Sequence, residues 1–589
     1  MCGIAGIMMR DGSTPSSQVL DALANALAHR GPDGQGRHVS GSVGLVQTRL
    51  AIIDLDTGDQ PLYDSTGPVL VGNGEIYNYI ELRKAFGEDK FKTGSDCEVP
   101  LKEYVEHGLA FAEKLRGMFA LAIHDPNENR LIIARDPFGI KPLYYVETEK
   151  YFAFASEAQA LVHAGLVRAS INDRKCLELM QLQFTCGQNT IYEGIKRVYP
   201  GETIVIQTGR ITERRQKQAL PYRKPTPISE EKALEEIDRV LKESVEIHQR
   251  SDVPYGLFLS GGIDSTAILM LMAELNDQPV QAYTAGFGDS SVHDERAHAR
   301  MLAQKTGADH YEIEFGQDDF WDTLPAIAGA MDDPAADYAI LPTWKLAKTA
   351  ASDLKVVLCG EGGDELFAGY GRYRSVMRPW WLGGRAVRHR GIFDDMGILY
   401  NSDKGWRDRI TGREAIASSS GLTRLQTAQA IDFADWLPND VLTKLDRCLM
   451  AHGLEGRTPF LDSEVASLAY LLPDKLKIKG RKGKWILRKW LDRKLPESKA
   501  FEKKRGFTVP VGEWMLSKGA ELGQLISEQD AIKEIGNPSD IKRLFTTSGK
   551  RESFAAWSLL FYALWHKANI QGYNQEMREM DILSALEVK

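Results

Sequence analysis

The sequence predicts two α/β domains: an antiparallel sheet layered with helices, followed by a parallel sheet with helices between its strands. Two apolar runs of strand length, Tyr255 to Leu259 and Val356 to Leu358, each lead into a glycine-rich turn. A strand, a glycine turn and a helix start are typical of parallel sheets, which bind ligands at the carboxyl ends of their strands. Upstream, Met118 to Asp125 and Arg130 to Asp136 flank a turn and predict an antiparallel hairpin.

Length, charge and cysteine spacing exclude several classes of protein. The 589 residues are enough for two large cores, and the net charge of −8 argues against a nucleic-acid-binding surface. The six cysteines include no CxxC and no paired spacing, so we expect neither disulfides nor a zinc site. Met1 to Arg10 lacks a signal-peptide pattern, and the apolar stretch Phe554 to Trp565 is too short to span a bilayer. We therefore expect a cytoplasmic protein with a buried helix there, and neither nucleic acid nor membrane among its partners.

A proline-punctuated connector predicts the domain boundary. Thr203 to Gln207 and Arg210 to Glu213 resemble a closing hairpin, and Pro221, Pro225 and Pro227 follow it. Ser229 is then the expected N-cap of an amphipathic helix. We therefore expect domains at residues 1–215 and 216–589.

The turn after the first strand has the features of a phosphate-binding loop. Ser260, Gly261 and Gly262 are small enough to let phosphate oxygens approach the free amides of a helix start. Asp264 at the mouth would repel a bare phosphate, so we expect it to hold Mg²⁺. A glycine turn before a helix can also be a packing turn, and this one matches neither a Walker loop nor a GxGxxG fingerprint.

A second loop repeats the arrangement with more acids. In GEGGDELFAGY, Glu361, Asp364 and Glu365 alternate with glycines directly after the second strand. SGGIDS resembles the pyrophosphate-binding loop of the PP-loop ATP pyrophosphatases, which cleave ATP to AMP and pyrophosphate. GEGGDELFAGY resembles the asparagine synthetase branch of that family. The resemblance implies that the two strands are neighbours in one parallel sheet.

The first residues suggest a different chemistry. Methionine before Cys2 is normally removed, which would leave a thiol and a free α-amino group on one residue. An α-amine with a pKa of about 7.7 to 8.0 can act as the base for the thiol. A small buried hydrophobic residue retained behind Met1 is the alternative for an isolated cysteine.

Five motifs in order favour the nucleophile. MCGIAGI, HRGPDG, RLAIIDL, NGEIYN and SDCE together resemble the class II glutamine amidotransferase domain, an N-terminal-nucleophile α/β/β/α sandwich that hydrolyses glutamine. The resemblance implies Cys2 as nucleophile and Asn73 with Gly74 as oxyanion hole, where one donor contributes about 2.7 to 4 kcal/mol. Arg49 would take the glutamine carboxylate and Asp96 its ammonium. The glutamine-binding residues implied by the resemblance are Arg49, Leu50, Ala51, Ile52, Ile53, Asn73, Gly74, Glu75 and Asp96.

The resemblance also assigns the second domain. It implies Mg²⁺ at Asp264 and Asp364, with Glu361 and Lys484 as further catalytic residues. The ATP-binding residues that it implies are Phe258, Ser260, Gly261, Gly262, Asp264, Ser265, Ala285, Cys359 and Gly360. For an aspartate acceptor we expect cations from Arg457 and Lys484, and acids from Asp332, Asp333 and Asp337 in a loop that closes over it. Asp332 and Asp333 before a proline could instead cap a turn.

Together these features predict a fold of an N-terminal-nucleophile sandwich followed by a PP-loop ATP pyrophosphatase-type domain. The implied reaction uses ATP, Mg²⁺, glutamine and aspartate, with a homodimer left open as the assembly. Relatives of the same architecture amidate other carboxylates, on sugars or antibiotic precursors, and share every motif above. β-Lactam-forming relatives are disfavoured by the intact Cys2, and tRNA sulfur-transfer enzymes by the missing CxxC. A ligand sensor without turnover is disfavoured by the intact set of acids.

Overall fold

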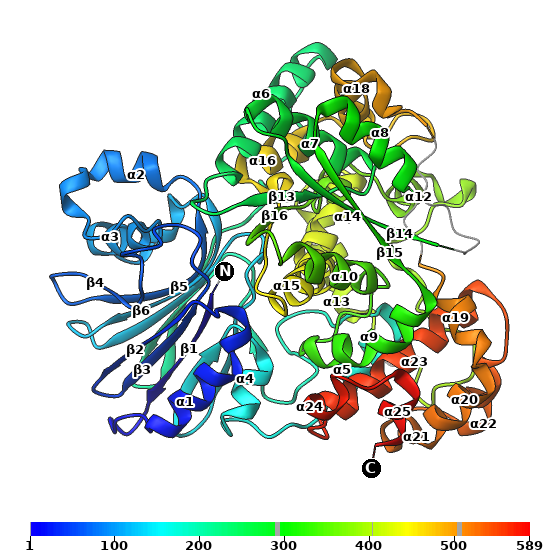
Figure 1. Cartoon of the computed structure of the whole chain (residues 1–589), viewed down its shortest axis with the longest axis horizontal. Helices are drawn as coiled ribbons and strands as arrows, with labels where there is room; N and C mark the ends of the chain where they lie inside the picture. The colour runs from blue at the N-terminus through cyan, green and yellow to red at the C-terminus, as the bar shows by residue number, and fades with distance from the viewer. Residues whose placement is uncertain (1, 289–294, 403–404, 503–508, 589) are drawn as a thin grey trace.

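The N-terminal part of the chain is a sandwich of two antiparallel sheets. The computed structural model describes residues 2–288, 295–402, 405–502 and 509–588, and Figure 1 shows the sandwich on the left. The first sheet has the order β10-β8-β9-β1-β3-β2, and the second has the order β12-β11-β7-β6-β5-β4. The strands of the first are β1 (Gly3–Met9), β2 (Gly34–Ser40), β3 (Val43–Arg49), β8 (Tyr144–Glu147), β9 (Tyr151–Ala155) and β10 (Lys196–Arg197). Those of the second are β4 (Leu62–Tyr63), β5 (Val69–Ile76), β6 (Gly117–Asp125), β7 (Arg130–Arg135), β11 (Glu202–Gln207) and β12 (Arg210–Gln216).

The central strands are apolar on both faces, because each sheet packs against the other sheet on one face and against helices on the opposite face. Along β1, Ile4 and Met8 face the second sheet, whereas Ala5 and Ile7 pack under a helix layer. The helices α1 (Ser17–Ala26) and α4 (Ala158–His163) cover the first sheet, and α3 (Glu98–His107) with α2 (Tyr79–Phe86) covers the second. The layers are therefore α/β/β/α, as expected, and the expected hairpins β6–β7 and β8–β9 are present.

The C-terminal part is built on a parallel sheet of order β15-β14-β13-β16-β17. Its strands are β13 (Tyr255–Phe258), β14 (Gln281–Phe287), β15 (Asp309–Phe315), β16 (Val356–Leu358) and β17 (Glu455–Arg457). β13 pairs with β16 in parallel, which confirms that the two glycine loops follow neighbouring strands. The strands β15 and β17 were not predicted. β17 is only three residues long, so its sequence carries too little alternation to show a strand.

Helices cover both faces of this sheet, as in doubly wound folds. One face packs against α6 (Glu230–His248), α7 (Ile263–Leu275), α8 (Arg296–Thr306), α16 (Ser463–Leu471) and α18 (Trp485–Lys494). The other packs against α9 (Gln317–Ala330), α10 (Ile340–Ala350) and α15 (Leu442–Met450). The Ser229 hydroxyl accepts a hydrogen bond from the Lys232 amide at 3.2 Å, which confirms the predicted cap of α6.

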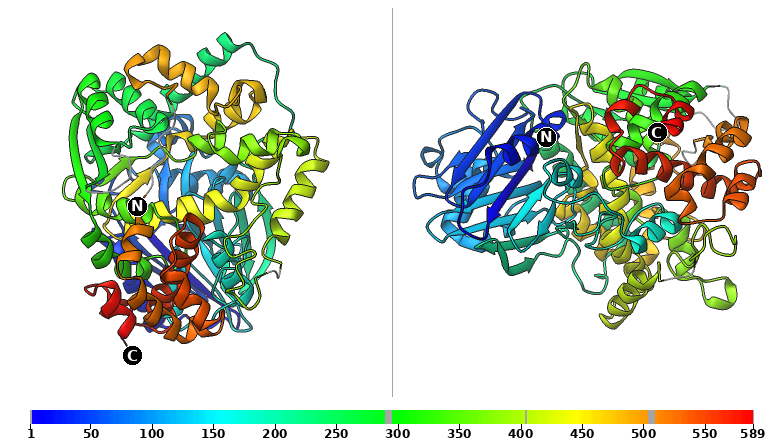
Figure 2. Two further views of the ribbon diagram at one scale, coloured as in Figure 1. Left: turned by 90° about the vertical axis from the view of Figure 1, so that its right-hand side faces the viewer. Right: turned by 90° about the horizontal axis from the view of Figure 1, so that it is seen from below.

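The remaining helices surround this core, and Figure 2 shows from below that the sandwich and the last helices lie at opposite ends of the molecule. They are α5 (Asp173–Leu182), α11 (Gly363–Leu366), α12 (Gly371–Met377), α13 (Asp408–Ser419), α14 (Arg424–Ile431), α17 (Asp474–Lys477), α19 (Val511–Ser517), α20 (Gly519–Glu528), α21 (Asp530–Lys533), α22 (Pro538–Phe545), α23 (Lys550–Asn569), α24 (Asn574–Met577) and α25 (Ile582–Glu587). The predicted buried helix is α23, whose Trp557 and Trp565 are fully buried and donate to backbone carbonyls near the end of α9. In the described ranges, none of the helices combines the length and the apolar character needed to cross a bilayer.

Candidate active sites

The first candidate site lies where the two sheets of the sandwich meet at Cys2. The Cys2 amide donates to Asn73 Oδ1 at 3.1 Å, and the Cys2 carbonyl accepts from Arg30 Nε at 3.3 Å. Asn73 is on β5, so these bonds join the first sheet to the second. Met1, whose removal we expect, lies outside the described residues.

Two candidate donors for an oxyanion are positioned beside Cys2. Asn73 is fully buried, and its Nδ2 has no hydrogen-bond partner within the described residues. Gly74 has φ of 154°, and a Cβ there would lie 2.1 Å from the carbonyl oxygen of Met118. Only glycine fits this position on β5, because β6 passes directly against it. An unsatisfied buried amide is costly, which is consistent with a partner supplied by a ligand.

Burial sets the ionisation of the groups around Cys2. It raises the pKa of the Cys2 thiol, although the Leu50 amide bonded to the sulfur opposes the shift. It also raises the pKa of Asp96 to about 6, although Asp96 accepts a hydrogen bond from the Ile76 amide at 2.7 Å. Burial and the nearby Asp96 raise the pKa of Glu75 well above its ordinary value. The thiol is therefore protonated at neutral pH and needs a base, whereas Asp96 is ionised.

The residues after β3 connect this site to the C-terminal part. Arg49 is buried and donates to Asp59 Oδ1 at 2.7 Å and to the Asp54 carbonyl. The Ile52 carbonyl accepts from the Asp252 amide at 3.0 Å, and Ile52 and Ile53 pack in a core cluster of the C-terminal part. Leu50 and Ala51 lie between, with the Ala51 amide bonded to Asp33 at 2.8 Å. Any contact of Ile52 and Ile53 with glutamine would therefore be through their backbone.

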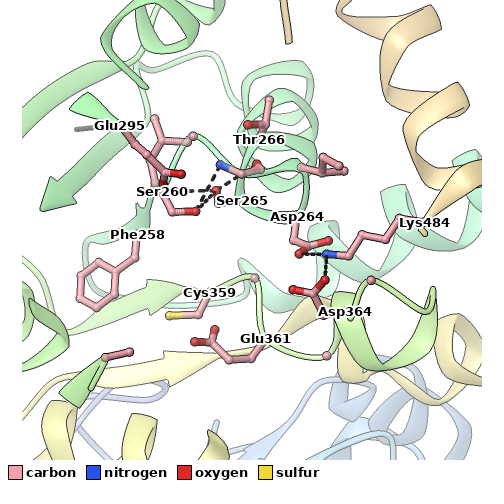
Figure 3. Close-up of a pocket in the computed structure, with 18 of the residues that line it drawn as sticks. Phe258, Ser260, Asp264, Ser265, Thr266, Glu295, Cys359, Glu361, Asp364 and Lys484 are labelled. Atoms are coloured by element: carbon pink, nitrogen blue, oxygen red, sulfur yellow. Dashed lines mark hydrogen bonds and ion pairs between the residues drawn. The ribbon is translucent and has the colours of Figure 1, made fainter. Parts of the chain in front are cut away.

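The second candidate site is a cavity of about 910 Å³ at the carboxyl ends of β13, β14 and β16. Figure 3 shows Phe258 and Cys359 at one end of it and Asp264, Asp364 and Lys484 at the other, with Glu361 between. All predicted ATP-binding and catalytic residues of this half line the cavity: Phe258, Ser260, Gly261, Gly262, Asp264, Ser265, Ala285, Cys359, Gly360, Glu361, Asp364 and Lys484.

The first glycine loop is held open toward the cavity. The Ser265 Oγ bonds to the Ser260 amide at 3.2 Å and to the Ser260 hydroxyl at 3.0 Å, closing the turn across the loop. Gly261 has φ of 68°, a left-handed conformation that favours glycine. Helix α7 starts at Ile263, so its first amides and the positive end of its dipole lie at the loop.

Lys484 joins the two acidic loops. Its Nζ forms ion pairs with Asp264 and, at 2.8 Å, with Asp364. Burial lowers the pKa of Lys484, but the two carboxylates outweigh it and hold that pKa above its ordinary value. A Cβ on Gly369 would lie 1.7 Å from Asp364 Oδ1, and one on Gly363 would lie 2.4 Å from Asp264 Oδ1. These two glycines therefore allow the carboxylates to converge. Lys484 has φ of 53° and precedes the first turn of α18.

The donor set fits the implied Mg²⁺. Two carboxylates converge on one cationic group, the Lys484 ammonium, so the position suits positive charge. The described part of the chain contains no cluster of three or more ligating side chains. Mg²⁺ is usually bound through one or two carboxylates and completed by waters and substrate phosphates, and Asp264 and Asp364 offer two such carboxylates.

The same cavity contains a further set of charged residues, Lys444, Asp337 and Glu361, of which Lys444 was not predicted. Lys444 of α15 pairs with Asp337 Oδ2 at 2.9 Å, and both line the cavity with Glu361. Burial raises the pKa of Glu361, which Lys444 opposes, and the nearby acids hold the pKa of Lys444 above its ordinary value despite burial. Its pairing with Asp337 spans 107 positions in sequence, so no local pattern indicated Lys444.

The prediction for the other acceptor residues is wrong in part. Asp332 pairs with Arg447 at 2.6 Å, and Asp333 pairs with Arg197 at 2.6 Å, both fully buried between the two parts of the chain. Arg457 pairs with Glu455 at 2.6 Å and lies 3.3 Å from Glu75 of the sandwich. None of these three lines the cavity, whereas Asp337 and Lys484 do.

Comparisons with known proteins match both parts of the chain. The family model described as asparagine synthase matches residues 236–567, and the glutamine amidotransferase domain model matches residues 1–217. Asparagine synthetase [glutamine-hydrolyzing] 1 of Bacillus subtilis (strain 168) is 33% identical over 97% of this chain and 97% of its own length. A putative asparagine synthetase [glutamine-hydrolyzing] of Mycobacterium tuberculosis (strain ATCC 25618 / H37Rv) is 32% identical over 96% of this chain and 97% of its own length. An amidase of Gibberella zeae is 29% identical over 81% of this chain and 84% of its own length.

The fold and the two family matches define a class of protein in which a glutamine amidotransferase sandwich is fused to an α/β domain of the asparagine synthase type. Within that class, the chain belongs to the asparagine synthase family.

Proposed function

We propose that this chain is a ligase that converts aspartate to asparagine, with ATP as co-substrate and glutamine as the nitrogen donor. ATP and aspartate would give β-aspartyl-AMP and pyrophosphate, and ammonia would then displace AMP. The observation that carries the proposal is the cavity in Figure 3, where residues predicted from four separate segments meet, with Phe258 and Cys359 at one end and the Asp264, Asp364 and Lys484 group at the other. We assign glutamine hydrolysis to residues 1–215 and amide synthesis to residues 216–589.

In the sandwich, the chain's own groups suffice for hydrolysis. The α-amine of a processed Cys2 takes the thiol proton, and the thiolate attacks the side-chain carbonyl of glutamine. Asn73 Nδ2 and the Gly74 amide stabilise the resulting oxyanion. The C–N bond then breaks, the proton passes to the leaving ammonia, and water hydrolyses the thioester to glutamate. Arg49 and Asp96 hold the carboxylate and the ammonium of glutamine.

In the cavity, Phe258, Ala285 and Cys359 accept the adenine, and the Ser260 to Ser265 turn accepts the phosphates. Asp264 and Asp364 would hold Mg²⁺, which neutralises charge on the pyrophosphate. Lys484, bonded to both carboxylates, also supplies positive charge at the phosphate end. Glu361, whose pKa is raised by burial, is placed to accept the proton that the attacking ammonia loses.

The Lys444–Asp337 pair is the best candidate for recognition of the acceptor's α-groups. Aspartate carries one ammonium and one carboxylate besides the reacting group, and this pair offers one partner for each within the cavity. This assignment replaces the one made from Asp332, Asp333 and Arg457. We propose that the enzyme acts on small molecules in the cytoplasm. Its assembly as a homodimer is left open.

The acceptor is tested directly by a panel of carboxylates. The chain is supplied with ATP, Mg²⁺ and ammonium together with aspartate, glutamate, a β-amino acid or a sugar uronate, and AMP and amide product are measured. We expect AMP and amide only with aspartate. AMP formed with a uronate and not with aspartate would leave the two-site mechanism in place and change the acceptor. Ligand binding without any turnover would favour a sensor.

A further inference from the structure

A protruding turn in the C-terminal part carries the most exposed large apolar side chains among the described residues. Trp380 is 80% exposed, Trp381 is 67% exposed and Leu382 is 64% exposed. They form a 3₁₀ turn shortly after the end of α12. Three adjacent large apolar residues held in water are uncommon and mark an interaction site. We call Trp380 to Leu382 the tryptophan tip.

The tip is an ordered structure. The amides of Leu382 and Gly384 both donate to the Pro379 carbonyl at 3.0 Å, and the two indole rings lie edge to face with centroids 5.9 Å apart. The amides of Arg378 and Arg385 both donate to the Ser375 carbonyl, at 3.3 and 3.4 Å. The two arginines therefore flank the base of the turn, one on each side of the tip.

The segment around the tip is strongly basic in an acidic protein. Residues 371–390 contain six arginines, one histidine and no acidic residue, whereas the whole chain has a net charge of −8. Arg378 and Arg385 are exposed, and neither forms an ion pair with a carboxylate in the described part of the chain. Beside them is an open hollow of about 570 Å³, lined by Arg385, His389, Arg390, Asp394, Asp395 and Trp406.

The stem of the segment is fixed to the body near the cavity. Arg372 pairs with the buried Asp432 at 2.8 Å, and Arg388 lies 3.7 Å from the same carboxylate. The Arg372 guanidinium also lies 3.9 Å from the ring centre of Tyr370, which lines the cavity. These contacts use Arg372 and Arg388, and Arg390 pairs with Asp395 at 2.9 Å. Arg378 and Arg385 at the base of the tip have no carboxylate partner among the described residues, although Arg385 bonds to His389 at 3.1 Å.

We propose that the tryptophan tip and its arginines dock this protein on an anionic lipid surface. Tryptophan partitions to the boundary between lipid headgroups and acyl chains, and arginines near that boundary attract anionic headgroups. The convex tip has an apolar end and a cationic base. These two features match the acyl-chain region and the anionic headgroup layer of a lipid surface. Stable anchoring to a membrane requires two contributions, because each of them alone is weak. The tip supplies a short apolar insertion together with positive charge that has no carboxylate partner. This inference departs from the expectation that no membrane is involved, which concerned spanning segments and leaders.

Vesicle sedimentation of the full-length chain tests the proposal. We expect binding to vesicles of phosphatidylcholine with phosphatidylglycerol, little binding to phosphatidylcholine alone, and release by high salt. Arg378→Glu with Arg385→Glu should reduce binding to the anionic vesicles by about tenfold or more. Trp380→Ser with Trp381→Ser should reduce it as well and remove the blue shift of tryptophan fluorescence on vesicle addition. The matched control, Leu516→Ala with Lys542→Glu, changes an exposed apolar side chain and an exposed cation elsewhere and should bind as the wild type does.

Synthesis from ammonium salts is measured for each variant to show that it is folded. Other results would overturn the proposal. Failure of the wild type to bind anionic vesicles, or equal binding by the wild type and the tip variants, would contradict it. A wild-type dimer that the tryptophan changes dissociate, without vesicle binding, would make the tip a contact between two copies. Binding of single-stranded nucleic acid in place of vesicles would assign the basic segment to that partner instead.

Discussion

Arg30 of the sandwich and Asp446 of α15 form a buried two-point ion pair between the two parts of the chain. The Arg30 Nη1 and Nη2 atoms lie 2.8 and 3.0 Å from the two oxygens of Asp446. The same guanidinium donates through Nε to the Cys2 carbonyl at 3.3 Å. Helix α15 also carries Lys444, which lines the cavity of the C-terminal part. One helix thus contacts both candidate sites.

Asp446→Asn should therefore affect the glutamine site more than the synthetase site. Arg30 keeps one carboxylate partner, Glu157 at 2.7 Å, so the change weakens the buried ion pairing of Arg30 without leaving its charge uncompensated. Because Arg30 orients the Cys2 carbonyl, we expect kcat/KM for glutamine hydrolysis to fall by about tenfold or more. Synthesis from ammonium salts at saturating substrate should change less.

The control for this variant is Asp462→Asn. Asp462 also forms a two-point ion pair across the two parts, with Arg116 at 2.6 and 2.9 Å, but Arg116 does not contact Cys2. It should lower the unfolding temperature without a selective loss of glutamine hydrolysis. Equal losses of hydrolysis in both variants would show that the Arg30 pair is only an interface contact.

Cys2→Ala should abolish glutamine hydrolysis and glutamine-driven synthesis while leaving ammonia-driven synthesis intact. The cavity contains its own complete set of groups and does not use the thiol. Cys97→Ala is the matched control, because Cys97 is buried beside Gly74, with Sγ 3.9 Å from its carbonyl oxygen. Mass spectrometry of the active protein is expected to show a chain that begins at Cys2. An active enzyme that retains Met1 would contradict the role of the α-amine.

Asp264→Asn and Asp364→Asn should each abolish AMP formation with either nitrogen source and spare basal glutamine hydrolysis. Each change removes half of the negative charge that surrounds Lys484 and the proposed Mg²⁺. We expect a loss of at least about a hundredfold in AMP formation. Asp319→Asn is the control, since Asp319 also pairs with a lysine, Lys345 at 2.6 Å, but neither of these residues lines the cavity. A parallel loss of both activities in a folded variant would refute the division between the two sites.

The pH dependence of glutamine hydrolysis should report Asp96. Burial raises the pKa of Asp96 to about 6, so the carboxylate that would hold the substrate ammonium is ionised above pH 6 and neutral below it. The α-amine base must also be unprotonated, with a pKa of about 7.7 to 8.0. We therefore expect kcat/KM to fall about tenfold per pH unit below the pKa of the amine and about a hundredfold per unit below pH 6.

Asp96→Asn should lower kcat/KM at every pH and leave a single tenfold slope down to pH 5. The measurement is glutamate release at low glutamine concentration across this range. The same steep limb in the variant would assign the second ionisation to another group.

Much of the fold was predictable because its signals are local. Ser229 caps α6, the two glycine loops follow neighbouring strands, and the hairpins of the sandwich lie where alternation and turn residues place them. Backbone preferences of this kind depend on a few adjacent residues. Cys2, Asn73 and the acids of the two loops could also be named as candidates, because those residue types occur together in short motifs.

Only the tertiary structure decided which charged groups are partners. Lys484 meets Asp264 from 220 positions away, and Arg30 meets Asp446 from 416 positions away. Tertiary packing also pairs Asp332 with Arg447 and Asp333 with Arg197, away from the cavity. Asp337, in contrast, lines the cavity and pairs with Lys444. A buried charge requires a partner, but the requirement is met by whichever opposite charge the packing of the helices and sheets brings near. The sequence therefore determined which groups are present, and the packing of the two parts determined what each of them contacts.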